Sequence, residues 1–186
     1  MVGADTSEFF PAIEDASKGI ELSKAWSATA RRLNADFKTS VGFINGKRCL
    51  GGFLELMVHC HYLIAEENSS LGLPEVTLPV IPGMEGCHWP LRKMTSDKYP
   101  DFMRFILSGK PVKAKQAVGW LTDYAGTIED SIKMAWKIAS GGDHGLKKRE
   151  LNEKSITNIP AEIGGLENTD DVTLTLKVYY NTMDVN

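Results

Sequence analysis

The chain has 186 residues, 42% of them hydrophobic and 24% charged, which is the balance of a single globular domain. Its net charge of −3 provides no basic surface for nucleic acid. No apolar run reaches membrane-spanning length, and the first residues lack the basic start and apolar stretch of a signal peptide. Cys49, Cys60 and Cys87 form no disulfide framework, so we expect reduced thiols in a cytoplasmic protein. From the charge and the apolar runs, we expect no nucleic-acid or membrane partner.

The first half of the chain alternates predicted helices and strands. Three patterns define the boundaries of these elements. They are apolar residues spaced for one helical stripe, a strand-like run closed by Asn45-Gly46, and two glycines that open an apolar segment. In chain order, the predicted elements are a helix over 14–35, a strand over 39–46, a helix over 50–60 and a strand over 61–67.

The second half continues this alternation up to Gly142. The predicted elements are a helix over 95–109 with Gly109 as its C-cap, a short helix over 113–121, a strand over 120–125 and a helix over 128–142. Residues 172–180 fit either a strand or a helix. Short strands that alternate with helices indicate the α/β class with parallel strands.

Two short motifs are rich in small residues and could bind an anion through backbone N–H groups. Gly51-Gly52 opens the helix over 50–60, where unsatisfied N–H groups carry partial positive charge and glycine leaves room for a ligand. Gly-Gly pairs are more often only turns. The run "VGAD" over 2–5 is a second, weaker candidate.

Three glutamates stand out by their positions. Glu55 lies in the first turn of an apolar helix, where a carboxylate is either put to use or simply favoured by the helix end, by about 0.3–1 kcal/mol. Glu75 follows Pro74 on stiff backbone, which suits either a positioned functional group or a surface turn. Glu85 is either a helix N-terminal carboxylate or a substrate-facing group.

A metal site is not predicted. The run His59-Cys60-His61, together with Cys87-His88, contains suitable ligand types but none of the spacings of known metal sites. We therefore interpret these residues as buried cysteines and partly exposed histidines.

Taken together, the motifs resemble the enoyl-CoA hydratase/isomerase family, the crotonase superfamily. The longest matching run is "NGKRCLGGFLELMVHCHYLIAEENSSLGLPEVTLPVIPGMEG" over 45–86, and "VGADTSEF" and "ILSGKPVKAKQAVGWLTDY" resemble the family's flanking motifs. The resemblance implies an α/β crotonase-like spiral of repeated ββα units, lacking the first strands, with a helical C-terminal part. It implies a catalytic core over 1–142, partial at its N-terminus, and a C-terminal linker or oligomerisation segment over 143–186.

The resemblance also assigns site residues. Glu55 becomes the base that activates water and Glu75 the proton donor, while the N–H groups of Ala4 and Gly52 form an oxyanion hole for a thioester carbonyl. The substrate-binding positions are Gly3, Asp5, Gly51, Pro82, Gly83 and Glu85.

The implied activity is the addition of water across the 2,3 double bond of a 2-enoyl-CoA thioester, as in fatty-acid β-oxidation, with coenzyme A in the substrate and no separate cofactor. The alternatives are an isomerase or acyl-CoA hydrolase of the same fold, or a non-catalytic acyl-CoA-binding protein. The implied partners are further copies in a homotrimer or hexamer, and either a missing N-terminal segment or a fused dehydrogenase domain.

Two departures from the family pattern lie near the site. His61 occupies a position that is commonly Asp, and the usual Gly-Gly-Thr-Gln-Arg run reads Glu85-Gly86-Cys87-His88-Trp89. These differences leave the identity of the acyl group open.

Overall fold

The computed structural model describes residues 15–78 and 81–149. The motif that contains Gly3, Ala4 and Asp5 and the ambiguous segment over 172–180 lie outside the described residues. So does most of the predicted C-terminal segment over 143–186, and the proposed boundary at 142 therefore stays a prediction.

The described part contains two three-stranded sheets. The first is wholly parallel, in the order β1 (Val41–Ile44), β3 (Tyr62–Glu66) and β6 (Tyr124–Gly126). The second has the order β2 (Arg48–Leu50), β4 (Ser70–Gly72) and β5 (Val112–Lys113), with β2 parallel and β5 antiparallel to β4. The predicted α/β class with parallel strands is confirmed. The second sheet was not predicted, because strands of two or three residues are too short to show an alternating pattern.

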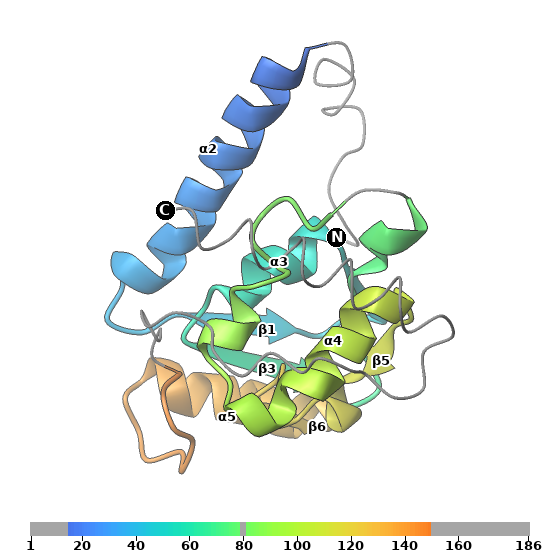
Figure 1. The fold of residues 1–186 in the computed structure, drawn as a ribbon. Coiled ribbons are helices and arrows are strands. Elements are labelled where there is room, and N and C mark those ends of the chain that lie inside the picture. Colours follow the sequence, from blue (N-terminus) through green and yellow to red (C-terminus); the bar gives the residue numbers. More distant parts are fainter. Residues whose placement is uncertain (1–14, 79–80, 150–186) are drawn as a thin grey trace.

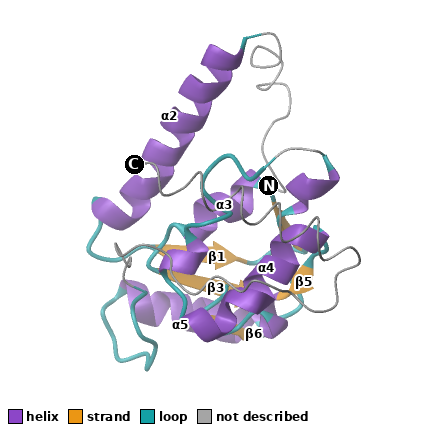
Figure 2. Ribbon diagram, in the orientation of Figure 1, coloured by secondary structure: helices purple, strands orange, loops and turns teal. Residues whose placement is uncertain are grey.

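The described residues also form four α-helices (Figures 1 and 2): α2 (Ala16–Ala35), α3 (Gly52–Val58), α4 (Tyr99–Ser108) and α5 (Ile128–Ala139). Gly109 ends α4 in the left-handed region with φ of 61°, as the predicted C-cap requires. The predicted helix over 113–121 is wrong, since only Ala114–Gln116 forms a single 3₁₀ turn. Gly119, with φ of 90°, lies outside the helical region and prevents an α-helix from continuing.

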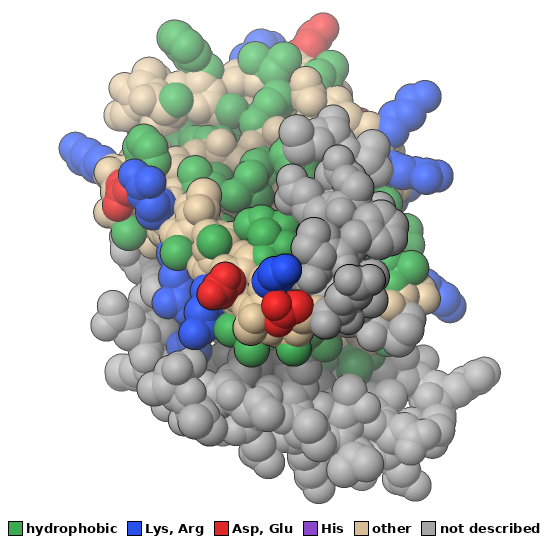
Figure 3. Space-filling view, turned by 90° about the horizontal axis from the view of Figure 1, so that it is seen from above, with side chains coloured by type: hydrophobic (Ala, Val, Ile, Leu, Met, Phe, Trp, Pro, Cys, Tyr) green, Lys and Arg blue, Asp and Glu red, His purple; other side chains and the backbone are tan. Residues whose placement is uncertain are grey.

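Helix α2 begins where Asp15 accepts a hydrogen bond from the backbone N–H of Ser17 at 3.0 Å. The predicted helix is confirmed, but its predicted apolar stripe does not pack along its length: within α2 only Ala30 is buried, and Ile20 is 56% exposed. Figure 1 shows the first turns of α2 extending away from the sheets, and the helix contacts the rest of the molecule from Ser23 onward. Seen from the end where α2 begins (Figure 3), hydrophobic side chains lie across the middle of the surface, next to a small group of acidic and basic ones, and other basic side chains lie toward its edges.

Helix α5 lies beside β3 and β6 (Figure 1) and confirms the amphipathic helix expected over this region. Its inner face is anchored by Ser131, whose buried hydroxyl donates to the carbonyl of Ala65 on β3 at 2.8 Å. Its outer face carries Ile132 and Trp136, which is 74% exposed. The sheet therefore buries one side of α5 and leaves aromatic surface on the other.

The main core lies between α3, α4 and the strands of both sheets. Leu54 of α3, Leu63 of β3 and Phe102 of α4 are fully buried there, beside the thiol of Cys49. The three cysteines are all buried and unbridged. Among the described residues, no helix is long and apolar enough to cross a bilayer. This core fixes both ends of α3, the helix on which the candidate site is built.

Candidate active site

The site begins at the N-terminus of α3. Gly51 has φ of 56°, where an L-residue is strained by about 1–2 kcal/mol, and its N–H donates to the carbonyl of Gly72 on β4 at 2.9 Å. Gly52 is the first residue of the helix, so its N–H has no acceptor within α3. The prediction that these glycines open a helix is confirmed, and the N–H of Gly52 remains a candidate oxyanion donor.

Gly51 also provides space for Glu75. A Cβ added at Gly51 would lie 3.1 Å from Oε1 of Glu75, which is closer than ordinary van der Waals contact. The two predicted positions are therefore neighbours in space although they lie on different elements. Absence of a side chain at Gly51 lets the Glu75 carboxylate pack against the start of α3.

Glu75 lies in a 3₁₀ turn over Pro74–Thr77 that opens with the proline, as the stiff Pro-Glu pair suggested. Its Oε2 is buried and has no hydrogen-bond partner among the described residues. Burial raises the pKa of this carboxyl above its usual value, with a small opposing contribution from a backbone hydrogen bond. A buried oxygen without a partner is costly unless another molecule supplies the missing contact.

Glu55 lies in the first turn of α3 and is only 3% exposed. Its Oε1 accepts hydrogen bonds from the backbone N–H groups of Met84 and Gly86, each at 2.8 Å. Burial raises its pKa to about 7; the two hydrogen bonds oppose this shift, and the charges of Glu75 and Glu85 add to it. Near neutral pH this carboxyl therefore exists in both protonation states, as a group that exchanges protons requires.

Gly86 is a functional position that the sequence analysis did not single out. A Cβ at Gly86 would lie 2.5 Å from Cγ and 2.8 Å from Oε1 of Glu55, so only glycine allows the close approach of its backbone. The available signal was a second glycine within four residues of Pro82, but only the structure shows what approaches it.

The Pro82-Gly83 corner connects this segment to α2. The carbonyl of Gly83 accepts a hydrogen bond from the hydroxyl of Ser23 at 2.7 Å, and the thiol of Cys87 lies 3.7 Å from the carbonyl of Pro82. These contacts place the corner beside Glu55, which is held by the next residue, Met84. The predicted substrate contacts of Pro82 and Gly83 stay predictions, as do those of Gly3, Ala4 and Asp5, which lie outside the described residues.

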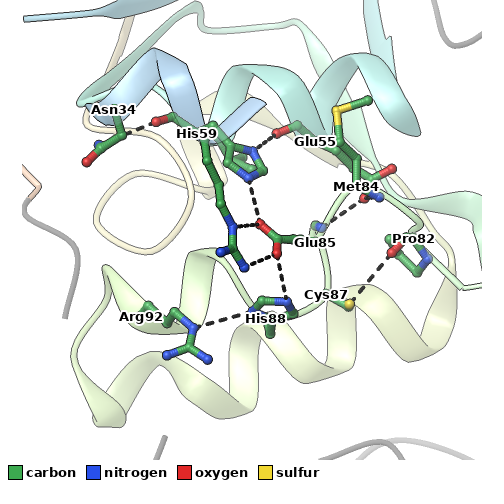
Figure 4. A network of polar contacts seen from close by, with 12 residues as sticks. Asn34, Glu55, His59, Pro82, Met84, Glu85, Cys87, His88 and Arg92 are labelled. Atoms are coloured by element: carbon green, nitrogen blue, oxygen red, sulfur yellow. Dashed lines mark hydrogen bonds and ion pairs between the residues drawn. The ribbon is translucent and has the colours of Figure 1, made fainter. Parts of the chain in front are cut away.

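Glu85 has partners within the chain. It adopts φ of 67°, and its carboxylate forms an ion pair with Arg31 of α2 and lies between His59 and His88 (Figure 4). Burial favours its neutral form, but hydrogen bonds from His59 and Arg31 and the nearby charges prevail and lower its pKa to about 2. Its predicted role in substrate binding stays a prediction, and the described geometry favours an internal role.

The expectation of partly exposed histidines is wrong for two of them. His59 is completely buried: its Nδ1 lies 2.7 Å from the carbonyl of Glu55, and its ring stacks on Trp89 at 4.3 Å between centroids. His61 is also buried, with its Nδ1 accepting from the N–H of Ser40 at 3.1 Å. In 15–78 and 81–149, no three His, Cys, Asp or Glu side chains gather in a way that could hold a metal ion.

Several known proteins are similar to this chain in sequence or in structure. A probable enoyl-CoA hydratase of Bacillus subtilis is 34% identical over 145 residues, which are 74% of this chain and 54% of the relative. The human peroxisomal bifunctional enzyme is 35% identical over 127 residues, 66% of this chain and 17% of the relative. The structure of an enoyl-CoA hydratase from Bacillus anthracis is 27% identical, with a TM-score of 0.57 over 75% of this chain and 54% of that one.

The chain belongs to the enoyl-CoA hydratase/isomerase superfamily. It has the crotonase fold, which a carnitinyl-CoA dehydratase from Mycobacterium thermoresistibile also shows at 18% identity and a TM-score of 0.62, covering 96% of this chain and 53% of that one. No protein-family model matches the chain. It spans between about a sixth and about half of the length of these curated relatives.

Glu85 has an unusual backbone conformation. Among the non-glycine residues of the described part, only Glu85 has a positive φ. Left-handed backbone is natural for glycine and strained for glutamate. The ion pair and the two histidine contacts therefore hold Glu85 in a backbone conformation that glutamate seldom adopts.

Proposed function

We propose that this chain carries the catalytic site of an enoyl-CoA hydratase, which adds water across the 2,3 double bond of a 2-enoyl-CoA thioester. The observation that carries the proposal is a pair of carboxyls on different elements, of which Glu55 is buried and Glu75 is half-buried. Glu55 has a pKa near 7 and Glu75 has an unpartnered oxygen, and Glu75 is close enough for its charge to raise the pKa of Glu55. The names of the curated relatives support the same reaction.

In the proposed mechanism, Glu55 is the base. Its Oε1 is held by two backbone N–H groups, so its Oε2 is the oxygen left to accept a hydrogen bond from the attacking water. As water adds to Cβ of the enoyl group, its proton passes to Glu55. A pKa near 7 suits this step, because the carboxylate is substantially populated at neutral pH and is still basic.

Glu75 then supplies the proton that Cα requires. Burial raises its pKa and so favours the protonated form that a donor needs. The thioester oxygen gains negative charge as water adds, and the N–H groups of Gly52 and Ala4 stabilise this charge as an oxyanion hole. The chain uses no separate cofactor in this scheme, because the coenzyme A thioester is part of the substrate.

We also propose that the chain works as part of a larger assembly. The α-subunit of the fatty acid oxidation complex of Idiomarina loihiensis is 30% identical over 162 residues, which are only 21% of that protein. We propose a fused dehydrogenase domain and a homotrimeric or hexameric state. Light scattering of the purified protein measures the oligomeric state directly.

The test of the activity is the loss of conjugated enoyl-thioester absorbance when the protein is mixed with crotonyl-CoA. Glu55→Gln and Glu75→Gln serve as matched variants, since glutamine keeps the shape of glutamate but cannot exchange the proton. Hydration by the wild type that both variants lose supports the proposal. Double-bond migration that survives Glu55→Gln would favour an isomerase, and binding of acyl-CoA without turnover would favour a non-catalytic protein.

A further inference from the structure

The carboxylate of Glu85 joins three elements of the fold. Arg31 of α2 donates from Nε to Oε2 at 2.9 Å and also from Nη2 to Oε1. Nε2 of His59, at the C-terminal end of α3, lies 3.4 Å from Oε2, and Nε2 of His88 lies 3.9 Å from Oε1. A bidentate arginine contact fixes the orientation of a carboxylate as well as its position. Glu85 is thus held from both sides at a left-handed backbone position.

The neighbours of Glu85 are the groups that hold Glu55. Met84 and Gly86, one residue before and one after, donate their backbone N–H groups to Oε1 of Glu55. The φ of 67° at Glu85 is part of the turn that directs both N–H groups at one oxygen. Any loss of this conformation would therefore release Glu55.

His59 links Glu85 to the backbone of Glu55 on α3. Its Nδ1 donates to the carbonyl of Glu55 at 2.7 Å, because a carbonyl oxygen can only accept. The same imidazole thus contacts the backbone of Glu55 and the side chain of Glu85 (Figure 4). Its ring also stacks on Trp89, which keeps it in place.

We propose that Arg31, Glu85 and His59 are positioning residues for Glu55, which keep the backbone over 84–86 in the conformation that fixes Oε1 and leaves Oε2 for the reacting water. The role of Glu55 as the base rests on the proposed hydratase function, whereas its fixation by this network does not.

The network also acts on the protonation of Glu55. The groups that face Glu55 are the two N–H donors, which lower its pKa, and the charges of Glu75 and Glu85, which raise it. The groups that face Glu85 are Arg31, His59 and His88, and Arg92 lies beside His88. Removing Arg31 weakens the hold on the N–H donors and leaves the charge of Glu85 less balanced. Both effects raise the pKa of Glu55.

Arg31 is the best position for a test, because its side chain is 57% exposed and its removal leaves no buried gap. Arg32 provides a matched control: it is the adjacent arginine of α2, and it pairs with Asp36, the C-cap residue of the same helix. We expect Arg31→Ala to lower kcat for crotonyl-CoA hydration by roughly 10–100-fold with little change in KM, since it displaces a catalytic group. We expect Arg31→Lys to recover part of this loss, and Arg32→Ala to behave like the wild type.

A second measurement does not depend on turnover. In protein labelled with ¹³C at glutamate carboxyls, the signal that Glu55→Gln removes identifies Glu55, and its titration gives the pKa of this group. The proposal expects a higher pKa in Arg31→Ala than in Arg32→Ala. Equal titration of Glu55 in the two variants would overturn it, whatever the rates. Lack of hydration by the wild type would overturn the hydratase function alone, because the titration would still test the network.

Discussion

The contact between Gly86 and Glu55 predicts that a single added methyl group lowers kcat strongly. In Gly86→Ala the new Cβ would lie 2.5 Å from Cγ of Glu55, about 0.9 Å inside the distance at which ordinary contacts begin. Because Glu55 is surrounded by core residues on α3, the strain is relieved by moving its carboxyl or the backbone over 84–86. Either movement lengthens the two hydrogen bonds of 2.8 Å that hold Oε1.

A displacement of about 1 Å at a reacting group can cost roughly 10²-fold in rate, so we expect kcat for crotonyl-CoA hydration to fall by roughly that factor in Gly86→Ala. KM should change much less. Gly46→Ala is the matched control, because a Cβ at Gly46 meets no atom within 4 Å. Thermal unfolding of both variants separates loss of structure from loss of positioning. A Gly86→Ala protein that melts like the control and hydrates at a rate within twofold of it would refute the reasoning.

Three further predictions concern the same site. Glu55→Gln and Glu75→Gln should each lower kcat by roughly 10²–10⁴ in steady-state kinetics. The fold-loss of kcat in the double variant should be much smaller than the product of the two single fold-losses, and multiplicative losses would contradict a shared mechanism. The folded protein raises the pKa of Glu55 from 4.5 to about 7, so the stability that Glu55 contributes is lost as pH rises through this range, whereas the lowered pKa of His88 contributes in the opposite direction. The free energy of unfolding of the wild type relative to that of Glu55→Gln should therefore fall as pH rises from 4.5 to 7, which urea titrations of the two proteins would measure. Gly51→Ala places an L-residue at φ of 56° and should lower the free energy of unfolding by about 1–2 kcal/mol, an effect that denaturant melts would detect and that a relaxed backbone would abolish.

Local sequence was sufficient to predict the start of the site. Gly51 and Gly52 have backbone properties that depend little on the rest of the fold, and the apolar residues after them require a helix. Glu55 was noticeable because a carboxylate is rare in such a run, and Glu75 because proline stiffens the chain before it. Each of these signals is contained within a few residues, and for this reason each could be recognised from the sequence alone.

Features that depend on distant contacts could not be predicted in this way. His59 is buried because Trp89, thirty positions later, stacks on its ring, and Gly86 is needed because Glu55 approaches it from α3. The segment over 113–121 shows the opposite error: its composition favours a helix, but the chain pairs with β4 and then turns at Gly119. In these cases tertiary contacts override local preference.

The burial of the cysteines makes thiol chemistry a measure of how often this core opens. Burial raises the pKa of the Cys49 thiol to about 12, so near neutral pH only a very small fraction is the thiolate that reacts with alkylating reagents. Cys60 and Cys87 are buried as well. In the closed protein all three should therefore resist modification, and the rate at which a reagent labels Cys49 reports transient exposure of the main core. The low background reactivity also allows a single cysteine, introduced on the exposed face of α2, to be labelled selectively.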